Sequence, residues 1–168
     1  MTAPATIQKR VPVGIGELVV SHDPTGILVA YGLGSCVGVT IFDPEGRIGG
    51  MAHVLLPWSE GCEPGESEPA RFADCAVDTL VQRFTDAGSV KRRLIVKIAG
   101  GGSVLGAANS EKFKIGQRNA EAIKERLRHH GLLLVSSQLG GVRGRTLELH
   151  IASGRTFVRT ATSPATEL

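Results

Sequence analysis

The chain has 168 residues and a net charge of +3, and 4% of its residues are aromatic, so its composition excludes a typical nucleic-acid-binding protein. No apolar stretch reaches the roughly 20 residues of a membrane-spanning helix, and the first ten residues lack the apolar core of a secretion signal. We therefore expect a cytoplasmic protein without membrane insertion, folded as one domain over residues 1–168, with flexible ends at residues 1–12 and 160–168.

Apolar runs separated by turn signals rich in Gly, Pro and Asp predict a series of strands. One turn is HDPTG (22–26), and another is DPEG (43–46), which suits a type I turn. The expected strands are residues 13–21, 26–34, 36–42, 47–56, 93–101 and 132–141, followed by a hairpin over 146–159.

Apolar residues at helical spacing predict two helices, over residues 69–87 and 115–130. Ser67 is placed to cap the first helix, Pro69 suits its first turn, and a glycine follows each helix. Strands that come first in hairpins and later alternate with helices are typical of an α/β (α+β) layered domain. We expect a mixed, largely antiparallel sheet with two main helices.

The stretch GLGSCVGVTIFDPEGRIGGMAHVLLP (32–57) places a cysteine and a histidine on the two arms of one predicted hairpin. A loop that pairs Asp43 with Gly46 also pairs Cys36 with His53, because both members of each pair lie at equal distances from the turn. Directly opposed residues share a face, with Cβ atoms about 4.5–5.5 Å apart. We therefore predict that the thiol and the imidazole meet.

The residue pattern predicts different roles for the two faces of this hairpin. Val37, Val39 and Ile41 alternate away from Cys36 and predict a core-facing side. The Cys36 side carries Gly38, Thr40 and Gly49, which we interpret as room for a ligand.

A cysteine beside a histidine favours the thiolate–imidazolium pair, the activated nucleophile of acyl transfer. The backbone N–H groups of Gly34 and Ser35 are candidates for an oxyanion hole. Two alternatives remain: a structural Cys and His, or a metal site completed by His22 or Cys62.

No cofactor motif occurs, and AGGGSVLG (99–106) does not match a phosphate loop, so we expect no cofactor. No C-x-x-C motif occurs. Since no secretion signal is apparent, we expect a cytosolic chain with reduced cysteines, in which Cys62 and Cys75 are incidental. Asn119, within IGQRN (115–119), is expected to have a structural role by bonding a buried loop.

The chain resembles the chemoreceptor glutamine deamidases of the CheD family. The resemblance rests on segments in family order: LGSCVGVTIFDPEGRIGGMAHVLLP (33–57), ARFADCAVDTL (70–80), KIAGGGSVL (97–105), IGQRNAEAIKERL (115–127) and LGGVRGRTLELHIASG (139–154). It implies a fold similar to deamidating bacterial toxins and a thiol-dependent conversion of receptor glutamines to glutamates in chemotaxis, with Cys36 and His53 as catalytic residues. Receptor methyl-ester hydrolysis is a further activity that the same chemistry permits.

The resemblance also implies partners: the cytoplasmic domains of methyl-accepting chemoreceptors, near receptor arrays at the inner membrane, and a CheC-type phosphatase. One residue departs from the family pattern, because a threonine is common where this chain has Ala30. A main-chain carbonyl near Ala30, or the hydroxyl of Thr40, would then have to orient His53, and we favour the carbonyl. The alternative is a catalytically weak or inactive adaptor that binds receptor or phosphatase.

Overall fold

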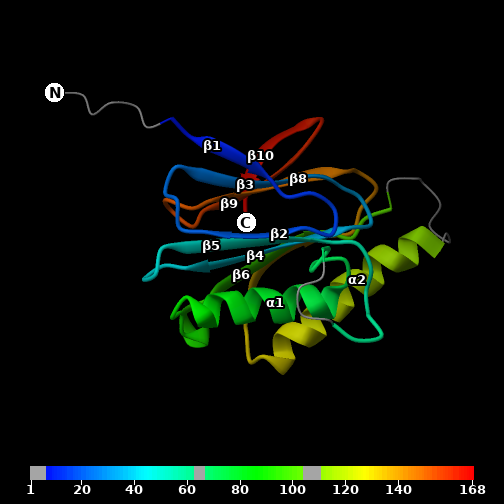
Figure 1. The fold of residues 1–168 in the computed structure, drawn as a ribbon. Coiled ribbons are helices and arrows are strands. Elements are labelled where there is room, and N and C mark those ends of the chain that lie inside the picture. The colour runs from blue at the N-terminus through cyan, green and yellow to red at the C-terminus, as the bar shows by residue number, and fades with distance from the viewer. Residues whose placement is uncertain (1–6, 63–66, 104–110) are drawn as a thin grey trace.

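A computed structural model describes residues 7–62, 67–103 and 111–168, and it has three layers: two stacked sheets and a pair of helices (Figure 1). The first sheet has the order β1-β3-β8-β9-β10 and the second β2-β5-β4-β6-β7. The strands are β1 (Lys9–Pro12), β2 (Leu18–Ser21), β3 (Gly26–Leu33), β4 (Val37–Asp43), β5 (Ile48–Val54), β6 (Ile95–Gly100), β7 (Leu134–Leu139), β8 (Arg145–His150), β9 (Thr156–Thr160) and β10 (Ser163–Glu167).

Helices α1 (Ala73–Asp86) and α2 (Glu111–His129) lie on the outer face of the second sheet, and a short 3-10 helix covers Lys91–Arg93 (Figure 1). Helix α1 packs its predicted apolar face on the sheet. Leu80 and Phe84 are completely buried, and a Cβ on Gly50 of β5 would meet both side chains. The helix–sheet core is therefore formed by the alternating residues that the sequence pattern identifies. None of the helices in the described segments has an apolar stretch long enough to cross a bilayer.

A second core lies between the two sheets and contains Leu28, Leu33, Met51, Leu147 and Leu149. The α+β class and the mixed pairing are confirmed, since β1 and β7 pair in parallel and most other neighbours are antiparallel. The strands form two sheets, however, where a single sheet was expected. The likeness to deamidating toxins stays a prediction.

Parts of the two ends that were expected to be flexible form strands. Lys9–Pro12 pairs with β3, and Ser163–Glu167 pairs with β9. Both are edge strands with mostly exposed side chains, so hydrophobic alternation cannot reveal them.

The first helix begins later than predicted, at Ala73. Phe72 instead pairs with Leu56 in an isolated bridge, and the Ala73 N–H donates to the Leu56 carbonyl. Ser67 and Pro69 therefore lie before the helix and do not cap it.

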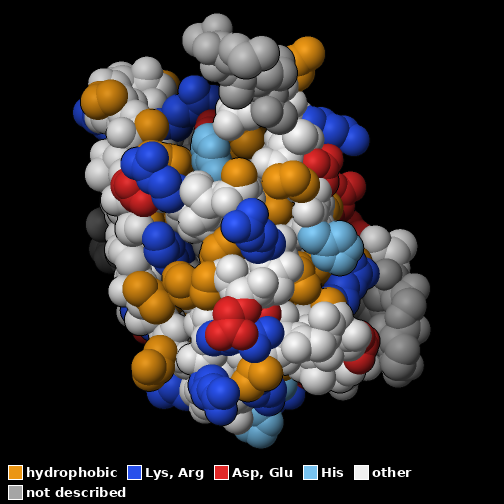
Figure 2. All heavy atoms as spheres, turned by 90° about the vertical axis from the view of Figure 1, so that its left-hand side faces the viewer, with side chains coloured by type: hydrophobic (Ala, Val, Ile, Leu, Met, Phe, Trp, Pro, Cys, Tyr) orange, Lys and Arg blue, Asp and Glu red, His pale blue; other side chains and the backbone are white. Residues whose placement is uncertain are grey.

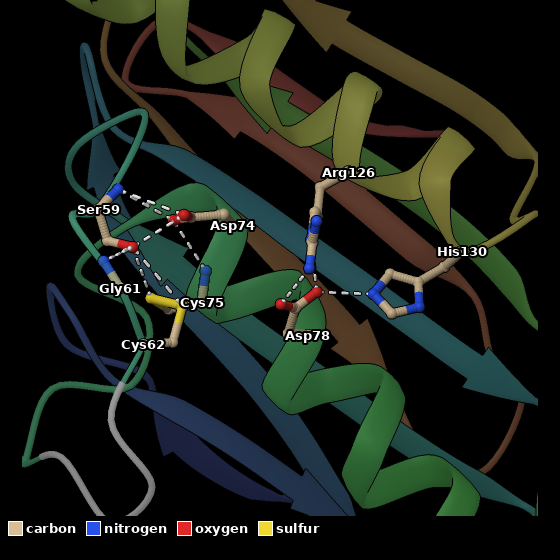
Figure 3. The surroundings of a disulfide bond; sticks show 8 residues. All are labelled: Ser59, Gly61, Cys62, Asp74, Cys75, Asp78, Arg126 and His130. Atoms are coloured by element: carbon tan, nitrogen blue, oxygen red, sulfur yellow. Dashed lines mark hydrogen bonds and ion pairs between the residues drawn. A yellow bond between two sulfur atoms is a disulfide. The ribbon is translucent and has the colours of Figure 1, made fainter.

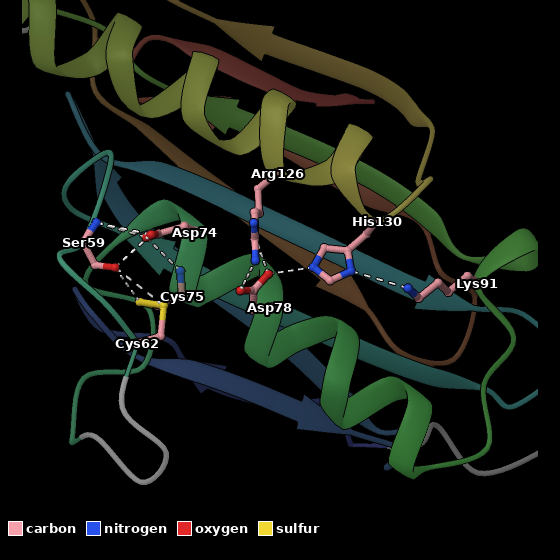
Figure 4. A network of polar contacts seen from close by, with 8 residues as sticks. All are labelled: Ser59, Cys62, Asp74, Cys75, Asp78, Lys91, Arg126 and His130. Carbon is pink, nitrogen blue, oxygen red and sulfur yellow. Dashed lines mark hydrogen bonds and ion pairs between the residues drawn. A yellow bond between two sulfur atoms is a disulfide. The ribbon is translucent and has the colours of Figure 1, made fainter.

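A polar network joins the two helices where they cross (Figure 4). Asp78 of α1 accepts two hydrogen bonds of 2.6 Å from Arg126 of α2, and His130 Nε2 lies 2.6 Å from the same carboxylate. Arg126 holds the pKa of Asp78 below its usual value against the opposing effect of burial. This network fixes α2 against α1.

Candidate active site

The hairpin of β4 and β5 has a register that differs from the prediction by two positions. Asp43 pairs with Ile48, and Gly38, not Cys36, lies opposite His53. The turn is longer because the Asp43 carboxylate accepts from the N–H groups of Glu45 and Gly46, while Arg47 adopts a φ of 50°. A shift of two positions preserves the face, so Cys36 and His53 are diagonal neighbours on the same side.

That side faces the first sheet, and the interpretation of its small residues as ligand space is wrong. A Cβ on Gly38 would lie 2.6 Å from Leu147 Cδ2, and one on Gly49 would lie 2.4 Å from Ile151 Cδ1. The glycines thus allow the two sheets to approach closely. The opposite side, with Val37, is buried against the helices as expected.

His53 is almost completely buried, at 2% exposure, and its ring is oriented by the main chain. Nδ1 lies 3.1 Å from the carbonyl oxygen of Val13. A carbonyl can only accept, so Nδ1 carries a proton and the neutral ring presents Nε2 as a base. Nε2 is buried without a hydrogen-bond partner among the described residues.

Cys36 precedes β4 in a short loop and is 8% exposed. Burial raises the pKa of its thiol, and burial lowers the pKa of His53 more than the Val13 carbonyl and Glu17 raise it. No hydrogen bond joins the two side chains in the described structure. Burial therefore opposes the expected thiolate–imidazolium pair, because desolvation favours the uncharged form of each group.

The loop that carries Cys36 is held by its carbonyl groups. The Gly34 and Cys36 carbonyls accept from the N–H groups of Gly102 and Gly101, at 2.7 and 2.8 Å. The Ser35 carbonyl accepts from Asn119 Nδ2 at 3.0 Å. Among the described residues, no hydrogen bond uses the N–H groups of Gly34 or Ser35, the two predicted oxyanion donors.

The two candidates for a third catalytic position do not orient His53. Ala30 lies on β3 opposite Leu147 and is fully buried, and the Thr40 hydroxyl donates to the Lys97 carbonyl at 3.1 Å. The main-chain carbonyl that bonds to His53 is that of Val13, whereas the sequence analysis favoured a carbonyl near Ala30. Sequence reasoning missed Val13 because a carbonyl has no residue-type signature.

The expectation of three reduced cysteines is wrong for two of them. Cys62 and Cys75 form a disulfide that ties the segment after β5 to the first turn of α1 (Figure 3). Ser59 supports this link: its hydroxyl donates to Asp74 at 2.8 Å. Cys36 is the free cysteine. The absence of a C-x-x-C motif gave no indication of the pair, since 13 positions separate its members in the chain.

The structure does not assemble the alternative metal site. Within the described residues, only Cys62, Asp74 and Cys75 bring three candidate ligand atoms close together, and the two sulfurs are bonded to each other. His22 is exposed and does not join Cys36 and His53 in such a group.

Basic side chains are interspersed with hydrophobic and acidic ones on the surface in Figure 2.

The fold and the site define an α+β protein with a buried cysteine and a carbonyl-oriented histidine between two sheets. A family model described as CheD chemotactic sensory transduction matches residues 55–160. The chain is 46% identical to a probable chemoreceptor glutamine deamidase CheD of Symbiobacterium thermophilum, over 88% of this chain and 90% of that protein. It is 43% identical to the chemoreceptor glutamine deamidase CheD of Thermotoga maritima, over 88% and 89%. The chain therefore belongs to the CheD family.

Among solved structures, the Bacillus licheniformis hypothetical protein YfiH is similar with a TM-score of 0.43 and 19% identity. The match covers 74% of this chain and 49% of that chain.

Proposed function

We propose that the protein is a cysteine-dependent protein-glutamine deamidase that converts chemoreceptor glutamines to glutamates. Its family membership and the names of its relatives support this activity. The observation that supports Cys36 and His53 as the catalytic residues is the hydrogen bonding of the His53 ring. Its Nδ1–H is held by the Val13 carbonyl, and on the face that Cys36 shares Nε2 has no hydrogen-bond partner among the residues that the structure describes.

In the proposed mechanism, His53 Nε2 accepts the thiol proton as Cys36 Sγ attacks the carboxamide carbon. The N–H groups of Gly34 and Ser35 stabilise the oxyanion. The carbon–nitrogen bond breaks, ammonia leaves with the proton from His53, and a thioester remains. Water, deprotonated by His53, then cleaves the thioester to glutamate and returns the thiol. Receptor methyl esters would enter the same sequence, with methanol as the leaving group.

Ala30 is the basis of the alternative, an inactive adaptor, because it lacks the hydroxyl common in the family. The bond between His53 and the Val13 carbonyl favours the enzyme, since the ring already has an acceptor. We expect Ala30→Thr to leave deamidation nearly unchanged and Cys36→Ala to abolish it. A large gain in rate from Ala30→Thr would instead support the adaptor.

The direct test uses cytoplasmic fragments of chemoreceptors, which are the proposed substrates. We place the enzyme in the cytoplasm, on the same side of the membrane as these receptor domains. Purified protein is incubated with these fragments, and glutamine-to-glutamate changes are mapped by mass spectrometry, with Cys36→Ala and His53→Ala as controls. Conversion that persists in both variants would contradict the proposal. Copurification with a CheC-type phosphatase tests the second proposed partner.

A further inference from the structure

Two segments that are separate in the sequence must meet for the proposed chemistry: the Cys36 loop and the end of β5 with His53. One fully buried side chain contacts both. Asn119 Nδ2 donates to the Ser35 carbonyl at 3.0 Å and to the Leu55 carbonyl at 2.9 Å. Ser35 is next to the nucleophile, and Leu55 is two residues after the histidine.

The geometry uses both hydrogen atoms of a single amide group. One hydrogen holds the loop before β4 and the other holds the chain after β5, so the amide fixes the separation between them. The Asn119 side chain is 0% exposed, so both hydrogen bonds are made by a donor that bulk water does not reach. The strand register makes Cys36 and His53 diagonal neighbours, which are farther apart than directly opposed residues. We infer that the distance between them also depends on the two hydrogen bonds of Asn119.

The same face of α2 also supports the other side of the loop. Gly116, three residues before Asn119, packs directly on the backbone of Gly101: a Cβ at Gly116 would lie 2.7 Å from the Gly101 carbonyl carbon. The N–H of Gly101 in turn donates to the Cys36 carbonyl. Helix α2 therefore holds the Cys36 loop at two points, one turn apart, and this explains the spacing of glycine and asparagine within IGQRN.

We propose that Asn119 is a positioning residue for the thiol–imidazole pair, acting through the Ser35 and Leu55 carbonyls together with the backbone contact at Gly116. This inference rests on the proposed function for its role in turnover. Its effect on the reactivity of Cys36 can be measured without any deamidation substrate.

The experiment compares Asn119→Ala with Ile123→Ala, a matched control on the same helix. Ile123 is also fully buried, but it belongs to the helix–sheet core, and its apolar side chain cannot form a hydrogen bond to either loop. Both variants are assayed well below their melting temperatures. Since a displacement of about 1 Å can cost about 100-fold in rate, we expect Asn119→Ala to lower kcat by about 10- to 100-fold with little change in KM. Ile123→Ala should keep kcat.

The second readout is alkylation of Cys36 by iodoacetamide, with and without His53→Ala. In the native chain His53→Ala should slow alkylation, and in the Asn119→Ala background it should have no further effect. Asn119→Ser retains one donor and should give an intermediate result if Asn119→Ala does not fold. The proposal would be overturned if Ile123→Ala lost as much kcat as Asn119→Ala. It would also be overturned if His53→Ala slowed Cys36 alkylation as strongly in the Asn119 variants as in the native chain, or did not slow it in the native chain. A native chain that never deamidates but shows the expected alkylation pattern would refute the proposed function alone.

Discussion

The close approach of the two sheets predicts a specific cost for adding one methyl group at Gly49. A Cβ there would lie 2.4 Å from Ile151 Cδ1 and 3.1 Å from Leu149 Cδ2, both buried side chains of the inter-sheet core. Overpacking a core usually costs about 1–3 kcal/mol. Because 1 kcal/mol shifts the melting temperature of a chain of this size by about 2–4 °C, Gly49→Ala should lower it by roughly 2–12 °C.

Thermal and urea unfolding measure this effect, and Gly144→Ala is the matched control. A Cβ on Gly144 would meet no atom within 4 Å, so that variant should stay within about 0.5 kcal/mol of the native chain. Ile151→Val removes the clashing Cδ1, so the double variant Gly49→Ala/Ile151→Val should be more stable than the sum of the single effects, by about 0.5–3 kcal/mol. Equal stability of Gly49→Ala and Gly144→Ala would refute the packing argument and restore the interpretation of this face as ligand space.

Four further predictions follow from the packing and the titrating groups. Leu80→Ala should lower the free energy of unfolding by about 2–5 kcal/mol in urea titrations, since Leu80 is fully buried between α1 and the sheet; a small loss would show that the helix packs elsewhere. Because burial raises the pKa of Cys36, its alkylation rate should keep rising above neutral pH, and a plateau reached in mildly acidic buffer would contradict a neutral resting thiol. Thiol titration of the unfolded protein should find one thiol before reduction and three after it, whereas three without reductant would exclude the disulfide. Arg93 lowers the pKa of the buried Asp43 carboxyl, so its stabilising effect is complete above the unfolded pKa of about 3.9 and is lost as pH falls; Asp43→Asn should remove that part of the acid sensitivity in unfolding titrations.

Local sequence pattern was sufficient to predict the interface between the helices and the second sheet. The alternation of Val37, Val39 and Ile41 in β4 and the helical spacing of α1 predict the side of the second sheet that packs on the helices. The same pattern places Cys36 and His53 on one face. The two residues share a face despite the error in the predicted register, because a shift of two positions leaves side-chain direction unchanged.

Contacts made by the main chain, and contacts between distant segments, were decided only by the tertiary structure. The carbonyl of Val13 orients His53 across 40 positions of sequence, and the Asn119 amide joins Ser35 to Leu55. A carbonyl is present at every residue, so no residue type marks the one that is used.

The sequence by itself therefore determines the composition of the site, a cysteine and a histidine on one face of a hairpin, and the amphipathic elements around them. The tertiary structure decides what lies against that face, namely a second sheet packed on Gly38 and Gly49, and in which direction burial shifts the pKa values of Cys36 and His53. The physical reason is the separation along the chain over which each effect acts. Side-chain periodicity reflects burial within a single element, whereas the packing of two sheets and the desolvation of Cys36 and His53 depend on segments that only folding brings together.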